Sequence, residues 1–113
     1  MSAMAVYANE LKRVRALGID SADIARATGA ARATVNAWLR ATRRPAAAHR
    51  ERLIELVAVV DRLTEVMDDE QIALWLQKPL PALADERPID AIAGGRYRDV
   101  SRLVTELEND SFA

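Results

Sequence analysis

The 113-residue chain contains no cysteine and only one histidine. Without cysteine it can form no disulfide, no thiolate metal site and no thiol nucleophile. The absence suits a reducing cytoplasm, where we expect the protein to act. His49 lacks candidate partners nearby and is interpreted as a surface helix residue rather than a ligand or base. No nucleophile–base pair can be assembled, so we predict no catalytic residues, no metal site and no cofactor.

Long apolar runs are also lacking. The most apolar stretch, Leu53 to Val60, is interrupted by Glu55 and is far too short to span a bilayer. No basic segment leads into an apolar one near the N-terminus, so we expect neither a signal peptide nor contact with a membrane. Half of the residues are nevertheless apolar, which argues against disorder and predicts one compact unit, or two very small ones sharing a core.

Charge is distributed unevenly along the chain. From Met1 to Arg52 there are ten Lys or Arg and four Asp or Glu, a net charge of +6. From Leu53 to Ala113 there are six and thirteen, a net charge of −7. A basic half attracts phosphate and an acidic half is repelled by it, so the asymmetry indicates two halves with different partners.

Composition and periodicity predict an all-α chain. Ala, Leu, Arg and Glu dominate, and no stretch alternates strictly between apolar and polar residues. We expect three helices before Pro45, because Gly18 and Gly29 supply stops and Asp20 or Ser21 a cap. They are expected over residues 6–17, over residues 21–28, and from about residue 31, with Val35, Trp38 and Leu39 on the inner face of the third.

A longer helix is expected over residues 46–67, because apolar residues recur there at spacings of three or four. Ile54, Val57 and Val59 widen this stripe beyond what one neighbour covers, which predicts a homodimer. Acidic residues 68–70 are interpreted as the cap of a further helix rather than a metal site, with Trp75 in the core. The remaining predictions are a short helix over residues 89–93, a final helix over 97–107 and a loose tail over 109–113.

The window from Ser21 to Arg40 has the spacing of a helix–turn–helix. Ala25 is small where the two helices approach closely, and Gly29 tolerates the positive φ of the turn. The window departs from the usual pattern in two places. Ala30-Ala31 replaces the common Ser or Thr cap of the second helix, and Ala41 stands where a glycine often ends it.

The outward face of the second helix of this window is predicted to enter the major groove of DNA. Arginine pairs bidentately with guanine and asparagine with adenine, so Arg32 and Asn36 are the predicted base readers. The other exposed polar residues are predicted to hold phosphates; they are Thr34, Arg40, Arg43 and Arg44.

The chain as a whole resembles the Xre/MbcA/ParS-type antitoxins, the DNA-binding partners of RES-domain toxins. The matching residues are the window just described, Arg52–Leu56, Trp75-Leu76 before Pro79, Pro88-Ile89-Asp90, Ile92, Gly94-Gly95, Val100, Leu103 and Val104. The resemblance implies an antitoxin that binds a toxin that consumes nicotinamide adenine dinucleotide (NAD) and blocks its active site. It also implies that the pair represses its own operon through the helix–turn–helix of the antitoxin.

We divide the chain into a helix–turn–helix region (1–45), a connecting and dimerisation helix (46–66) and, by the resemblance, a toxin-binding region (67–113). Phe112, the only phenylalanine, follows several acidic residues and is predicted to anchor in a pocket of the toxin. The alternative for the tail is a frayed terminus without a role. The predicted toxin-binding residues are Tyr97, Glu108, Asp110, Ser111, Phe112 and Ala113.

Two other interpretations stay open. The chain could be a stand-alone helix–turn–helix regulator whose C-terminal half only dimerises or senses a ligand. It could also be a structural interaction module whose helical hairpin never touches DNA. A neighbouring toxin gene, or a partner retained through high salt, favours the antitoxin over the stand-alone regulator.

Overall fold

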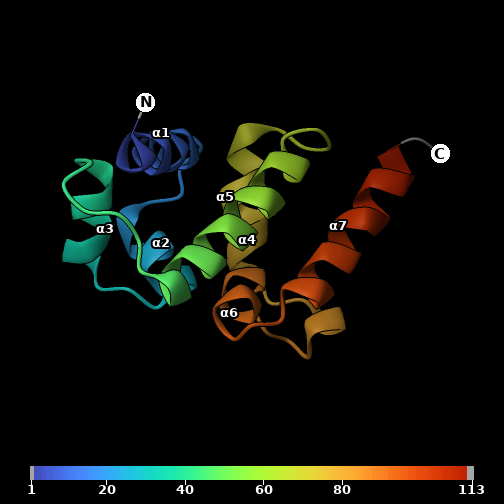
Figure 1. Cartoon of the computed structure of the whole chain (residues 1–113). Helices are drawn as coiled ribbons and strands as arrows, with labels where there is room; N and C mark the ends of the chain where they lie inside the picture. Colours follow the sequence, from blue (N-terminus) through green and yellow to red (C-terminus); the bar gives the residue numbers. More distant parts are fainter. Residues whose placement is uncertain (1, 112–113) are drawn as a thin grey trace.

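The computed structural model describes residues 2–111, which form seven α-helices and one short 3-10 helix (Figure 1). Within this range the chain has no strand, only an isolated antiparallel bridge between Leu80 and Glu86. The predicted all-α class is therefore confirmed. The elements are α1 (Ala3–Ala16), α2 (Ser21–Thr28), α3 (Arg32–Leu39), α4 (Ala47–Leu63), α5 (Asp69–Gln77), η1 (Pro81–Leu83), α6 (Pro88–Ala93) and α7 (Tyr97–Ser111).

Local capping explains where the first helices begin. Ser2 Oγ accepts a hydrogen bond from the backbone N–H of Ala5 at 3.2 Å, so α1 begins before the predicted residue 6. Asp20 and Asp23 cap α2 by reciprocal hydrogen bonds of 2.8 and 3.2 Å, and both ends of this helix match the prediction. No side chain caps α3, as the alanines before it predicted.

The predicted end of α4 is wrong. The helix stops at Leu63 rather than Met67, and turn residues lead to Asp68. Asp68 precedes α5, and its backbone N–H donates to Gln71 Oε1 at 3.0 Å. Because Asp68 caps the first turn of α5, a new helix begins here, and α4 cannot continue into it.

The predicted loose tail is also partly wrong, because α7 continues to Ser111. Arg62 of α4 accounts for the extension, since its guanidinium contacts three successive turns of α7. It donates to Ser101 Oγ at 2.7 Å, to Thr105 Oγ1 at 2.8 Å and to Glu108 Oε1 at 2.6 Å. These hydrogen bonds hold the turns of α7 as far as Glu108 against α4.

One hydrophobic core runs through the described residues, from Leu11 on α1 to Val104 on α7. Helix α2 packs against α3 and α4 and also against α6, so N-terminal and C-terminal helices share this core. The predicted inner face of α3 is buried, as are Leu53, Leu56, Val60 and Leu63 of α4. Trp75 packs against this core but is only half-buried, so the prediction of core packing holds for part of its side chain.

The molecule is elongated, with a longest dimension of 43 Å. Helices α1 and α3 lie at one end, α7 lies at the other, and α4 runs between them (Figure 1). Among the described residues, no helix is both long and apolar enough to cross a bilayer.

Candidate functional site

Helices α2 and α3 are joined by a short turn that places α3 across the end of the molecule. Gly29 ends α2 in the left-handed conformation, at φ +78°. Ile24 and Ala25 of α2 and Val35 of α3 are buried, as the spacing of the window predicted. The opposite side of α3 is left for polar residues.

The six predicted DNA-contacting residues lie on α3 or just after it. Arg32, Arg40, Arg43 and Arg44 are exposed, whereas Thr34 and Asn36 are half-buried. Asn36 is fixed from inside, because its Oδ1 accepts a hydrogen bond from Ser21 Oγ at 3.1 Å. Three of the six share one hollow of about 280 Å³ with Trp38 and His49; they are Thr34, Arg43 and Arg44.

The prediction that His49 is a surface residue without partners is wrong. It is half-buried, its Nδ1 lies 2.8 Å from the carbonyl oxygen of Thr28, and its ring centroid lies 6.0 Å from that of Trp38. The contact links the start of α4 to the end of α2 behind the basic loop. No local pattern predicts it, because His49 and Thr28 are 21 residues apart.

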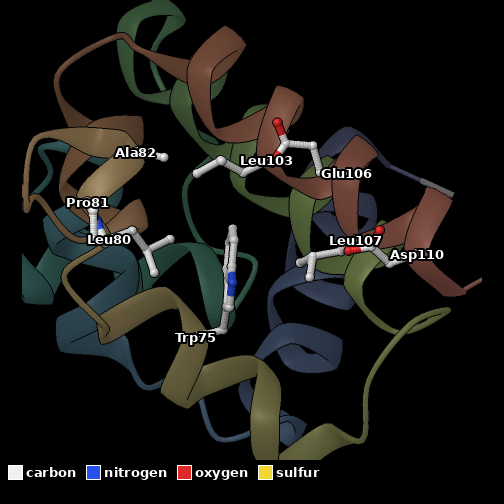
Figure 2. A pocket seen from close by; sticks show the side chains of 8 residues that line it. All are labelled: Trp75, Leu80, Pro81, Ala82, Leu103, Glu106, Leu107 and Asp110. Atoms are coloured by element: carbon white, nitrogen blue, oxygen red, sulfur yellow. The ribbon is translucent and has the colours of Figure 1, made fainter.

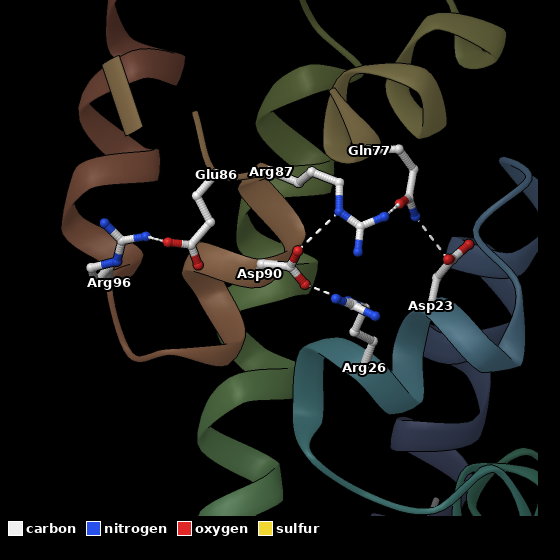
Figure 3. Close-up of polar contacts among 7 residues, drawn as sticks. All are labelled: Asp23, Arg26, Gln77, Glu86, Arg87, Asp90 and Arg96. Carbon is white, nitrogen blue, oxygen red and sulfur yellow. Dashed lines mark hydrogen bonds and ion pairs between the residues drawn. The ribbon is translucent and has the colours of Figure 1, made fainter. Parts of the chain in front are cut away.

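A polar network fixes α2 to the C-terminal helices (Figure 3). Gln77 of α5 donates to Asp23 Oδ1 at 2.8 Å and accepts from Arg87 Nη1 at 2.7 Å. Asp90 of α6 then pairs with Arg87, at 2.9 Å, and with Arg26 of α2. The network therefore joins the basic end of the molecule to its acidic half through side chains from three helices.

The electrostatics of the network follow from these contacts. Hydrogen bonding to Arg26, and secondarily to Arg87, lowers the pKa of Asp90 against the opposing effect of burial. Burial raises the pKa of Asp23, so the pKa values of the two carboxyls are shifted in opposite directions. At the far edge, Glu86 pairs with Arg96 (Figure 3).

The predicted toxin-binding residues are not brought together in one place. Tyr97 begins α7 and lines a polar hollow with Arg52 and Arg96, whereas Asp110 lies about 20 Å away at 1.5 Å rise per residue. Glu108 is held by Arg62, which lowers the pKa of its carboxyl. Ser111 ends α7, and Phe112 and Ala113 lie outside the described residues.

Beside the exposed Asp110 lies a hollow of about 220 Å³ between α5, η1 and α7 (Figure 2). Trp75, Leu80, Leu103 and Leu107 are the large apolar residues that line it. The sequence prediction included Asp110 but missed this hollow. The i, i+4 spacing of Leu103 and Leu107 signals an apolar face of α7, but not that part of this face stays uncovered.

The described residues form an all-helical protein with exposed arginines at α3 and exposed carboxylates on α7. Proteins with a similar sequence and a similar fold are known. No protein-family model matches the chain. It is 27% identical over 99 residues, 88% of either chain, to the mycobacterial cidal antitoxin MbcA of Mycobacterium tuberculosis and of Mycobacterium bovis.

The structure is also similar to a chain in the crystal structure of the M. tuberculosis MbcT–MbcA toxin–antitoxin complex. The TM-score is 0.81 at 26% sequence identity, over 94% of this chain and 96% of that chain. Both the sequence and the fold are therefore similar to MbcA antitoxins along most of the chain. The part of the predicted resemblance that concerns MbcA is confirmed.

Proposed function

We propose that this chain is an antitoxin that binds and neutralises a cognate RES-domain toxin that consumes NAD, and that also represses its own operon. The homology to MbcA over 88% of the chain carries the proposal. It is supported by the similarity of the fold to a chain of a toxin–antitoxin complex. The toxin is blocked at its active site by the acidic C-terminal half of this chain.

The charge of that half supports the blocking mechanism. Residues 53–113 carry a net charge of −7. An enzyme that binds an anionic dinucleotide needs a basic groove, so an acidic surface is complementary to it. Among the predicted toxin-binding residues, Asp110 is exposed and can contact a basic groove. Glu108 already pairs with Arg62.

The basic end supports DNA binding through a helix–turn–helix made of α2 and α3. Helix α3 enters the major groove, where Arg32 and Asn36 read bases. The hydrogen bond from Ser21 holds Asn36 in a fixed orientation and leaves its amide nitrogen to act as a donor. Arg43 and Arg44 of the following loop hold phosphates, together with Thr34 and Arg40.

The protein acts as a homodimer that joins α1 and α4 of two copies. Val6 and Ile54 are 46% and 55% exposed and line an apolar hollow of about 330 Å³ with Tyr7 and Val57. Large apolar residues gathered on one face commonly mark an interface. Such a dimer would bind half-sites about 10 base pairs apart or a multiple of that spacing.

Co-expression with the protein encoded by the neighbouring reading frame tests the proposal. The neighbour alone should arrest growth and deplete NAD, and this chain should restore both. A variant with the α3 substitutions Arg32→Ala and Asn36→Ala is the matched control, because it should still protect cells while losing repression. A neighbour whose toxicity this chain does not relieve would contradict the antitoxin function and favour a stand-alone regulator.

A further inference from the structure

The hollow between α5, η1 and α7, which we call the Trp75 groove, has the form of a receptor for an apolar side chain (Figure 2). Its volume is about 220 Å³. A cavity of about 150 Å³ suffices to hold a benzene ring, so the groove can take one Leu, Met or Phe side chain. Trp75 also lines a neighbouring hollow with Met67 and Leu74, and Leu74 is 70% exposed. The apolar surface therefore continues past the groove itself.

The rim of the Trp75 groove carries unpaired negative charge. Glu106 and Asp110 stand one turn apart on α7, are exposed, and line the groove. Within residues 2–111 neither forms a salt bridge, whereas Asp99 and Glu108 of the same helix do. A segment that seats an apolar side chain in the groove brings its neighbouring residues within reach of these two carboxylates.

We infer that the Trp75 groove receives one large apolar side chain from a basic segment of the toxin, with a Lys or Arg about one helical turn away that pairs with Glu106 or Asp110. The inference rests on the proposed antitoxin function and specifies where and by what chemistry the toxin is held. An apolar anchor in a pocket with a charged rim is the usual arrangement of a binding hot spot.

The rim charge argues against the other possible occupants. DNA phosphates are repelled by Glu106 and Asp110. In a symmetric contact between two copies, each copy presents the same two carboxylates to the other, which opposes association. A basic protein segment can place an apolar side chain against the apolar wall and a cationic side chain beside the two rim carboxylates.

Filling the groove tests the inference without removing core residues. Ala82 is exposed on η1 and lines the groove, so Ala82→Phe occupies the space in the full-length protein. Affinity for the protein of the neighbouring reading frame, measured by calorimetry, should fall at least about tenfold. Glu106→Lys should slow association and weaken its dependence on salt. Trp75 emission should shift to shorter wavelength when the wild-type chain binds, and should not shift with Ala82→Phe at equal concentrations.

The matched controls are Ala22→Phe on α2 and Glu65→Lys after α4, both at exposed positions outside the groove and outside the proposed toxin-binding region 67–113. Each should bind as the wild type does, and thermal unfolding should show that all four variants fold. Wild-type affinity in Ala82→Phe overturns the inference but leaves the antitoxin function standing. Failure of the wild-type chain to bind the neighbour at all overturns the proposed function instead. Altered self-association of Ala82→Phe with unchanged toxin affinity assigns the groove to a second copy and also overturns the inference.

Discussion

Gly29 and Ala41 bracket α3 with left-handed backbone, at φ +78° and +57°. A residue with a Cβ is less stable than glycine in this conformation by about 1 kcal/mol. The left-handed position before α3 is therefore occupied by glycine, which tolerates it, and the left-handed position after α3 by alanine, which is strained there. Ala41 was noted in the sequence as a departure from the usual glycine, and the backbone shows what that departure costs.

Exchanging these residues should change stability in opposite directions. Ala41→Gly should raise the free energy of unfolding by about 0.5–1 kcal/mol, and Gly29→Ala should lower it by about 1 kcal/mol. A Cβ at Gly29 meets only His49 Nδ1 at 4.0 Å, so strain in the backbone and not a clash causes the loss. Urea denaturation followed by circular dichroism measures both. Ala22→Gly on the exposed face of α2 is the control, and an equal loss in Ala41→Gly and Ala22→Gly would contradict the explanation.

Asp90 should make the fold sensitive to acid. Its pKa is lowered in the folded state by Arg26 and Arg87, so its contribution is present at neutral pH and is lost as pH falls from about 5 through the lowered pKa. Asp90→Asn should reduce stability at pH 7 and flatten the acid side of the stability profile. Denaturation midpoints between pH 3 and 7, about the range in which carboxyls titrate, measure this. Glu106→Gln, a carboxyl without an ion pair among the described residues, should keep the wild-type profile.

At the scale of elements, α2 and α3 were predicted well and the ends of α4 and α7 were not. The signals for α2 are local, because Asp20 caps it and Gly29 stops it within the same short window. The end of α7 depends on Arg62, which is 46 residues from Glu108 in the chain. A contact at that separation leaves no periodic pattern in either segment. The half-exposed state of Trp75 was missed for a similar reason, because it depends on α7 leaving the groove uncovered.

Arg62→Ala should release the C-terminal turns of α7. The substitution removes the hydrogen bonds that link α4 to Ser101, Thr105 and Glu108 of α7. Amide hydrogen exchange should become faster over residues 105–111 and stay unchanged in α2. Arg102→Ala, which removes an exposed arginine of α7, is the control. Equal exchange in Arg62→Ala and the wild type would show that α7 does not need the contact.

At the scale of the whole molecule, α3 and α7 lie at opposite ends of a 43 Å body (Figure 1). Exposed arginines lie on α3 and in the loop after it, and the exposed Glu106 and Asp110, which form no salt bridge among the described residues, lie on α7. The composition predicted that the two halves of the chain differ in charge. The distance between α3 and α7 could not be predicted, because it depends on how α4 packs between them (Figure 1).

DNA affinity should fall steeply with salt, because phosphate contacts release counterions. Arg43→Ala and Arg44→Ala should each reduce the slope of log affinity against log salt by about 1 and weaken binding to all sequences alike. Arg32→Ala should relax sequence preference instead. Fluorescence anisotropy with operator and scrambled DNA at several salt concentrations separates the two effects. If the double variant with Arg43→Ala and Arg44→Ala keeps the wild-type slope of log affinity against log salt, these two arginines do not contact phosphates.

Ile54→Asp should convert the proposed dimer to a monomer, because it puts a charge in the apolar face between α1 and α4. Light scattering coupled to size exclusion measures the mass of each variant. Leu74→Asp is the control, since Leu74 is also a large apolar residue and is more exposed than Ile54, but lies on α5. A wild-type chain that runs as a monomer at all concentrations would contradict the dimer.

The packing of α2 against both α3 and α6 has a consequence for turnover of the protein. Because a single core serves both ends, removal of either half by a protease would expose part of the core of the other half and destabilise it. The proposed contacts with DNA and with a toxin would therefore be weakened by the same cleavage, so that the proposed repression and protection would decline together.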